Sequence, residues 1–181
     1  MKVLGIVGSP RAESNTEILV KKVLEGAKLK GAEVEIFKIN DMEINWCQGC
    51  FHCQVYGECR QNDDMQRIYD AIRSAEAVVI GTPIYMGHVS AQTKTLLDRL
   101  LALINVLRGE SALKGKKLVL VYSQGRGSDG ENVMKELGVR LSHLGMSFVG
   151  IVGGNGLNEP GAVRDREDLL ILAHKLGTQL A

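Results

Sequence analysis

Short runs of apolar residues recur along this chain at intervals that suit buried strands. The five runs are residues 3–7, 34–39, 77–80, 118–122 and 148–152. Helical spacing of apolar residues appears between and after them, over 18–27, 65–72, 96–104, 133–141 and 169–176. Strands that alternate with helices predict a parallel sheet covered on both faces.

Two segments depart from this regular alternation. Residues 40–62, after the second strand, form a connection far longer than most loops, and loops of this length are usually functional. Residues 91–107 are expected to form a helix whose apolar positions spread beyond one stripe. Such a helix is buried either by a partner chain or by the protein itself on both sides. Five strands and five helices in 181 residues suit one flavodoxin-like domain, 1–181: a doubly wound, five-stranded parallel α/β sheet with order 2-1-3-4-5.

The charge balance and the absence of long apolar runs exclude several functions. Lys plus Arg is 22 and Asp plus Glu is 21, and a net charge of +1 gives no general affinity for nucleic acid. No apolar run reaches the roughly 18 residues of a membrane span. The first residues lack the cationic head and long apolar run of a signal peptide. We therefore expect a cytoplasmic protein that binds neither nucleic acid nor membrane.

The loop after the first strand is rich in hydrogen-bond donors. These donors are Ser9, Arg11, Ser14, Asn15 and Thr16. The loop leads into a helix whose unpaired N–H groups and dipole favour an anion, so it predicts a phosphate site. A helix N-terminus alone, with Ser14 and Glu17 as a capping box, explains only those two residues. Neither G-x-G-x-x-G nor a Walker loop with correct spacing is present, which disfavours a Rossmann site and nucleotide hydrolysis.

The loops after the third and fourth strands end at the same edge of the predicted sheet. They supply Pro83, Ile84, Tyr85, Met86, Gly87 and His88, and then Ser123, Gln124 and Gly125. Tyr85 can stack on a planar ring, and backbone amides can bond the polar rim of that ring. Three converging loops thus predict a site for a phosphate, a linking chain and a flat ring. We assign no catalytic side chain, because the chemistry belongs to the cofactor.

All four cysteines of the chain lie within 40–62. They are Cys47, Cys50, Cys53 and Cys59, with spacers of two, two and five residues. Four thiolates this close together are the usual ligand set of one [4Fe–4S] cluster. Structural zinc and a redox dithiol are the alternatives, although a dithiol needs only one C-x-x-C pair. Disulfides are disfavoured in a cytoplasmic protein.

These motifs resemble those of the iron–sulfur flavoproteins, within the flavodoxin-fold NAD(P)H-dependent FMN reductases. The resemblance rests on G-S-P-R at 8–11 with S-N-T at 14–16, on 82–92, and on the quartet leading to D-D-M at 63–65. It implies that the first loop holds the phosphate of FMN, the second wraps the isoalloxazine, and the quartet carries a [4Fe–4S] cluster. It also implies a homodimer or homotetramer with the cluster near a subunit interface.

Two enzymatic functions and one non-enzymatic function follow from the cofactors and the resemblance. The first is electron transfer between the cluster and FMN, from a ferredoxin-type donor to a small-molecule, two-electron acceptor. The second is an NAD(P)H-dependent FMN or quinone reductase in which the quartet is structural or redox-sensing. The third is a zinc- or thiol-based sensing module on the same scaffold.

Overall fold

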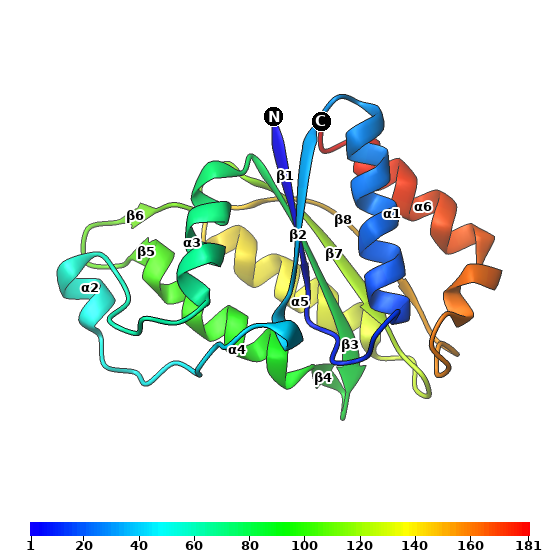
Figure 1. The fold of residues 1–181 in the computed structure, drawn as a ribbon, viewed down its shortest axis with the longest axis horizontal. Helices are drawn as coiled ribbons and strands as arrows, with labels where there is room; N and C mark the ends of the chain where they lie inside the picture. The colour runs from blue at the N-terminus through cyan, green and yellow to red at the C-terminus, as the bar shows by residue number, and fades with distance from the viewer.

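The computed structural model describes residues 1–181 and confirms the predicted α/β fold. Five parallel strands form the central sheet in the order β2-β1-β3-β7-β8 (Figure 1). Their bounds are β1 (Lys2–Val7), β2 (Glu33–Lys38), β3 (Ala77–Tyr85), β7 (Lys117–Ser123) and β8 (Ser147–Gly154). Numbered along the chain, these five strands have the predicted order 2-1-3-4-5. A short strand, β4 (His88–Val89), adds antiparallel to β3.

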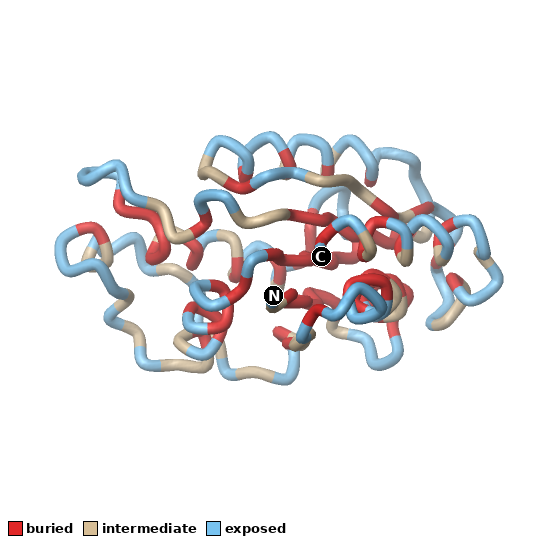
Figure 2. The backbone as a smooth tube through the Cα atoms, turned by 90° about the horizontal axis from the view of Figure 1, so that it is seen from above, coloured by how far each residue is buried: buried red, intermediate tan, exposed pale blue.

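Helices cover both faces of the sheet. Successive strand residues point to opposite faces, and both faces carry apolar side chains that the helices bury. The five long helices are α1 (Asn15–Leu29), α3 (Met65–Ser74), α4 (Ala91–Arg99), α5 (Gly130–His143) and α6 (Glu167–Thr178). Val3 and Val7 of β1 are buried with α1 and α6, whereas Leu4 and Ile6 are buried with α3, α4 and α5. Figure 2 shows the buried backbone between these helical layers. No helix is long and apolar enough to cross a membrane.

The helix predicted over 91–107 is wrong in its second half. It ends at Arg99, and the chain continues through a 3₁₀ turn, η2 (Leu100–Leu103), into a two-stranded ribbon. That ribbon pairs β5 (Ile104–Asn105) with β6 (Glu110–Ser111). The side chains of Val106 and Leu107 are exposed, so the apolar residues after η2 do not form a second buried helix face.

A distant side chain ends the helical segment. The buried amide of Gln54 donates to the carbonyl oxygens of Leu101 at 3.2 Å and Ile104 at 2.7 Å. Its Oε1 accepts the N–H of Val106 at 2.9 Å. These bonds satisfy backbone groups that a continuing helix would have paired internally. Local apolar spacing cannot reveal a partner about fifty positions away.

The long connection after β2 is present, and it contains all four cysteines. Between β2 and α3 the chain forms a 3₁₀ turn, η1 (Ile39–Asp41), and one short helix, α2 (His52–Tyr56). We call residues 40–62 the cysteine arm. In Figure 1 the arm extends to one end of the molecule, beside β5 and β6. Another 3₁₀ turn, η3 (Ala162–Asp165), precedes α6.

Candidate functional site

A cavity of about 380 Å³ lies at the edge of the sheet where the parallel strands end. Its walls come from the loops after β1, β3, β7 and β8, which the parallel topology brings to one edge. Most residues expected to bind the cofactor line it: Ser9, Arg11, Ser14, Asn15, Pro83, Ile84, Tyr85, Met86, Ser123 and Gly125. Their contact with a ligand stays a prediction. We call this space the switch-point cavity.

One end of the switch-point cavity is the N-terminus of α1. Ser14 is the N-cap residue, and its Oγ accepts the N–H of Glu17 at 3.1 Å. The N–H groups of Asn15 and Thr16 have no acceptor in the chain. Beside them, Nη1 of Arg11 donates to the carbonyl oxygen of residue 158 at 2.7 Å. Free N–H groups, a positive helix end and a guanidinium together favour an anion, and the binding of one here stays a prediction.

Glu17 does not complete the capping box. Its carboxylate pairs instead with Lys21 at 2.7 Å and Lys38 at 3.3 Å, so it ties α1 to β2. Burial by itself raises the pKa of Glu17, but hydrogen bonds and charge from the two lysines outweigh it. The pKa of Glu17 therefore lies below its usual value. The helix cap is Ser14 alone.

The side chains of Asn15 and Thr16 are occupied by other parts of the protein. The amide of Asn15 donates to the carbonyl oxygens of Leu157 at 3.1 Å and Glu159 at 2.8 Å, and its Oδ1 accepts the N–H of Val163 at 2.9 Å. Asn15 thus holds the loop that forms the opposite wall. Thr16 is fully buried, and its hydroxyl contacts the Ser123 hydroxyl at 2.8 Å. Ser123 lines the switch-point cavity, but Thr16 does not.

The second predicted loop is a tight β-hairpin. Tyr85 pairs with His88 across β3 and β4, and Met86 and Gly87 form the two-residue turn with φ of 49° and 72°. Positive φ at both turn residues is the geometry that matches the twist of hairpin strands. Tyr85 is 40% exposed and Met86 is fully exposed. Both side chains therefore stand free at the rim of the switch-point cavity.

Three other predicted residues lie away from the lining of this cavity. Gly87 and His88 border a separate cavity of about 560 Å³ beside α4 and α5. Gln124 is buried, and its amide bonds Asp129 and the N–H of Gly130, which shapes the loop after β7. These positions follow from the hairpin and loop geometry, which residue type alone does not specify.

Sequence reasoning missed four lining residues: Arg126, Leu157, Asn158 and Pro160. Arg126 stands next to the predicted Gly125. The other three follow β8, whose end must lie at the same edge as the ends of the other parallel strands. Topology was the signal that would have found them.

The four cysteines lie around a second, small cavity of about 30 Å³. All four are free thiols; Cys50 is exposed and the others are half-buried. Tyr69 of α3 and Arg99 of α4 line the same space. We call it the cysteine cavity. No group of three or more His, Cys, Asp or Glu side chains is arranged to hold a single metal ion.

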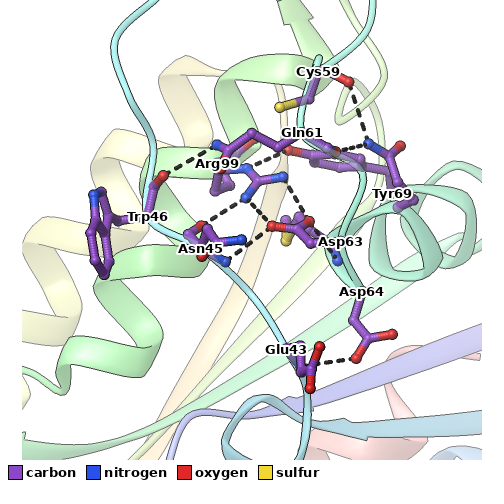
Figure 3. A network of polar contacts seen from close by, with 11 residues as sticks. Glu43, Asn45, Trp46, Cys59, Gln61, Asp63, Asp64, Tyr69 and Arg99 are labelled. Carbon is purple, nitrogen blue, oxygen red and sulfur yellow. Dashed lines mark hydrogen bonds and ion pairs between the residues drawn. The ribbon is translucent and has the colours of Figure 1, made fainter.

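A buried ion pair lies under the cysteine cavity (Figure 3). Arg99 binds Asp63 through Nη1–Oδ2 at 2.8 Å and Nη2–Oδ1 at 2.9 Å, and the side chains are 1% and 5% exposed. Arg99 Nη1 also donates to the carbonyl oxygen of Asn45 at 2.7 Å. Burial by itself raises the pKa of Asp63, but hydrogen bonds from Arg99 and the Asn45 N–H outweigh it. The pKa of Asp63 therefore lies below its usual value.

Comparison with known proteins agrees with this architecture. Residues 1–153 match the model of the NADPH-dependent FMN reductase family. An iron–sulfur flavoprotein of Archaeoglobus fulgidus is 34% identical over 184 residues, which cover 100% of this chain and 79% of that protein. One from Methanocaldococcus jannaschii is 43% identical over 99 residues, 55% of this chain and 51% of its own length. The matched part thus spans about half of that relative.

A solved structure shows the same fold over the whole chain. The NAD(P)H:quinone oxidoreductase from Methanothermobacter marburgensis superposes with a TM-score of 0.78 at 20% identity, covering 100% of this chain and 99% of that one. Fold and cavity together define a flavodoxin-like α/β protein with a cavity at the point where the strand order reverses, beside the N-terminus of α1. The chain belongs to the NADPH-dependent FMN reductase family and, within it, to the iron–sulfur flavoproteins.

Proposed function

We propose that the protein is an FMN-dependent oxidoreductase that moves electrons between a [4Fe–4S] cluster and FMN. The observation that carries this proposal is that one chain has both the switch-point cavity and a second cavity lined by all four cysteines. The family supports FMN, and the names of the iron–sulfur flavoprotein relatives support an iron–sulfur centre beside the flavin.

The switch-point cavity fits FMN in size and in the chemistry of its walls. Its volume of about 380 Å³ lies within the usual range of small-molecule sites. The free N–H groups at the start of α1 and the Arg11 guanidinium would hold the phosphate. Tyr85, whose ring is partly free at the rim, would contact the isoalloxazine.

The cysteine cavity offers the donor set of a cluster, and at about 30 Å³, close to the volume of one water molecule, it would have to widen to admit one. Four thiols border one space, and four thiolates are the ligands that a [4Fe–4S] cluster takes. A cluster is larger than one ion, and each thiolate binds a different iron atom at its surface. The four sulfur atoms therefore need not converge on one point, as the ligands of zinc do. Cys47, Cys50, Cys53 and Cys59 would be those ligands.

The two bound cofactors would couple one-electron and two-electron chemistry, because a cluster transfers single electrons and FMN accepts one or two. The chain's own residues bind and orient. Arg11 and the α1 N-terminus offset the phosphate charge, while Tyr85 and Met86 cover one side of the cavity. No side chain is required as an acid or base.

Cofactor content after anaerobic purification tests the proposal directly. We expect about four iron, four acid-labile sulfide and one FMN per chain, as one set of four cysteine ligands requires. Cys50→Ala should lose the iron and keep FMN, whereas Glu58→Ala, an exposed change in the same arm, should keep both. Full iron content in Cys50→Ala would remove Cys50 from the ligand set, and one zinc without flavin would favour the sensing module.

The electron donor decides between the two enzymatic functions. We propose a ferredoxin-type donor and a small-molecule acceptor, with the protein acting as a homodimer or homotetramer. Direct reduction by NAD(P)H is the second candidate, which the FMN reductase family favours. Stopped-flow reduction of the flavin by reduced ferredoxin and by NADPH separates them, because the true donor reduces it faster. FMN without iron, after attempted cluster reconstitution, would also favour the NAD(P)H-dependent reductase.

A further inference from the structure

We propose that Arg99 is the positioning residue of the cysteine arm: through Asp63 it fixes both ends of the cysteine-bearing stretch to α4 and thereby sets the thiolate cage. This inference rests on the proposed function, since it concerns how the chain prepares the cysteines for the cluster.

The geometry of the ion pair joins two points on either side of the quartet. Arg99 holds the Asp63 carboxylate in a two-pronged contact and also holds the carbonyl oxygen of Asn45. The N–H of Asn45 donates to Asp63 Oδ2 at 3.0 Å. All four cysteines lie between Asn45 and Asp63, so this guanidinium helps to close the base of the loop, together with the Gln61–Trp46 and Glu43–Asp64 hydrogen bonds (Figure 3).

The arm packs against the core through a few half-buried side chains, which are Met42, Ile44, Cys53 and Cys59. Between residues 46 and 62 only Gln54 is buried, and the large apolar side chains of Trp46, Phe51, Val55 and Tyr56 are exposed. Gln54 bonds the backbone of 101–106. Both anchors therefore attach the arm to α4 and the residues that follow it. A segment with so few buried apolar side chains depends in part on such polar contacts for a fixed shape.

Helix α4 connects this base to the switch-point cavity. Its N-cap is Ser90, whose Oγ donates to the carbonyl oxygen of Gly8 at 2.6 Å at the start of the phosphate loop. Nine residues later the helix ends at Arg99. At 1.5 Å per residue α4 spans about 13 Å between the loop after β1 and the cysteine cavity.

Arg99 also brings charge to the cysteine cavity. Its side chain lines that cavity together with Tyr69, whose hydroxyl accepts from Arg99 Nε at 3.2 Å and donates to the Arg99 carbonyl at 2.9 Å. A buried cation favours the more negative, reduced state of a thiolate-bound cluster, and Asp63 offsets part of that effect. Arg99 thus affects the redox potential of the cluster as well as the geometry of its ligands.

The test compares wild type, Arg99→Met, Arg99→Lys and Asp63→Asn after anaerobic reconstitution. The readouts are iron and FMN per chain, the rate of iron loss to a chelator, and the cluster midpoint potential by electron paramagnetic resonance titration. Arg99→Met should lose iron about 10-fold faster or more, as expected for a lost outer-shell partner, with FMN unchanged. Arg99→Lys should recover part of the retention, and Asp63→Asn should shift the potential upward.

A matched control separates this role from general destabilisation. Lys135→Met removes an exposed cation from α5, where Lys135 pairs with Glu131 at 2.7 Å away from the cysteine cavity, and should change neither iron loss nor potential. In metal-free protein, Asp63→Asn should speed amide exchange at Asn45, which tests the contact without the cluster.

The outcomes for the inference and for the proposed function are distinct. If wild type holds iron while Arg99→Met matches it in iron loss and in potential, the inference is overturned and the proposed function stands. The inference also fails if Lys135→Met has the same effect as Arg99→Met. A wild type that takes up no iron overturns both together.

Discussion

The variant Asn15→Ala tests whether Asn15 contacts the ligand or instead holds the wall of the switch-point cavity in place. The Asn15 side chain makes three hydrogen bonds to the backbone of 157–163, and Asn15 is 4% exposed. At about 1 kcal/mol for each hydrogen bond, the loss of all three lowers the free energy of unfolding by about 3 kcal/mol. The backbone groups left unpaired in the interior do not make this cost smaller. Better helix propensity returns about 0.5 kcal/mol. We therefore expect the metal- and flavin-free protein to lose roughly 2.5 kcal/mol, or roughly 5 to 10 °C in Tm.

Urea unfolding of flavin-free protein, together with FMN titration, measures both effects. Asn15→Ala should lower the unfolding midpoint and also weaken FMN binding, because Leu157, Asn158 and Pro160 form part of the cavity wall. Asn15→Asp should be no better, since a carboxylate oxygen would face two carbonyl oxygens. The matched change Arg11→Ala, at an exposed side chain, should alter stability by less than about 0.5 kcal/mol and weaken FMN about 10-fold. Unchanged unfolding of Asn15→Ala with weaker FMN binding would refute the reasoning.

Two further predictions concern α1. Glu17→Gln should destabilise the protein at pH 7, because the carboxylate pairs with Lys21 and Lys38. The folded-state pKa of Glu17 is lowered, so its stabilisation is present above the unfolded pKa of about 4.3 and lost as pH falls through the folded pKa. The difference from wild type in urea midpoint should therefore shrink between pH 7 and pH 3; a constant difference would contradict the ion pairs. Gly26→Ala should destabilise by about 1–3 kcal/mol, because its Cβ would clash with the His174 carbonyl oxygen of α6. A gain in thermal stability, as helix propensity alone predicts, would show that α1 and α6 can separate at little cost.

The strands and most helices were predictable because the burial of each element determines the pattern of apolar residues along its own stretch of sequence. A strand such as 77–80 is apolar at every position, and the helices carry their apolar stripe at regular spacing. The order of the strands then followed from the few ways in which alternating strands and helices can pack. The ribbon of β5 and β6 escaped prediction, because its four paired residues have no distinctive pattern.

The candidate site was predictable in its location and only partly in its contacts. Donor-rich loops after successive parallel strands must meet at one edge, and most of the chosen residues line the resulting cavity. Residue type could not show that Asn15 serves the far wall or that Gln124 serves its own loop. An amide bonds whichever polar groups the fold brings near, and those groups come from distant positions.

By itself, the sequence determined most of the elements, the donor-rich loop after β1 and the compact cysteine quartet, because each depends on residues that are neighbours along the chain. The tertiary structure alone decided where α4 ends and which residue holds the cysteine arm. Gln54 meets the backbone of 101–106, and Asp63 meets Arg99 across 36 positions. Such contacts form only after the sheet has brought α3, α4 and the arm together, so no local pattern of residues can reveal them.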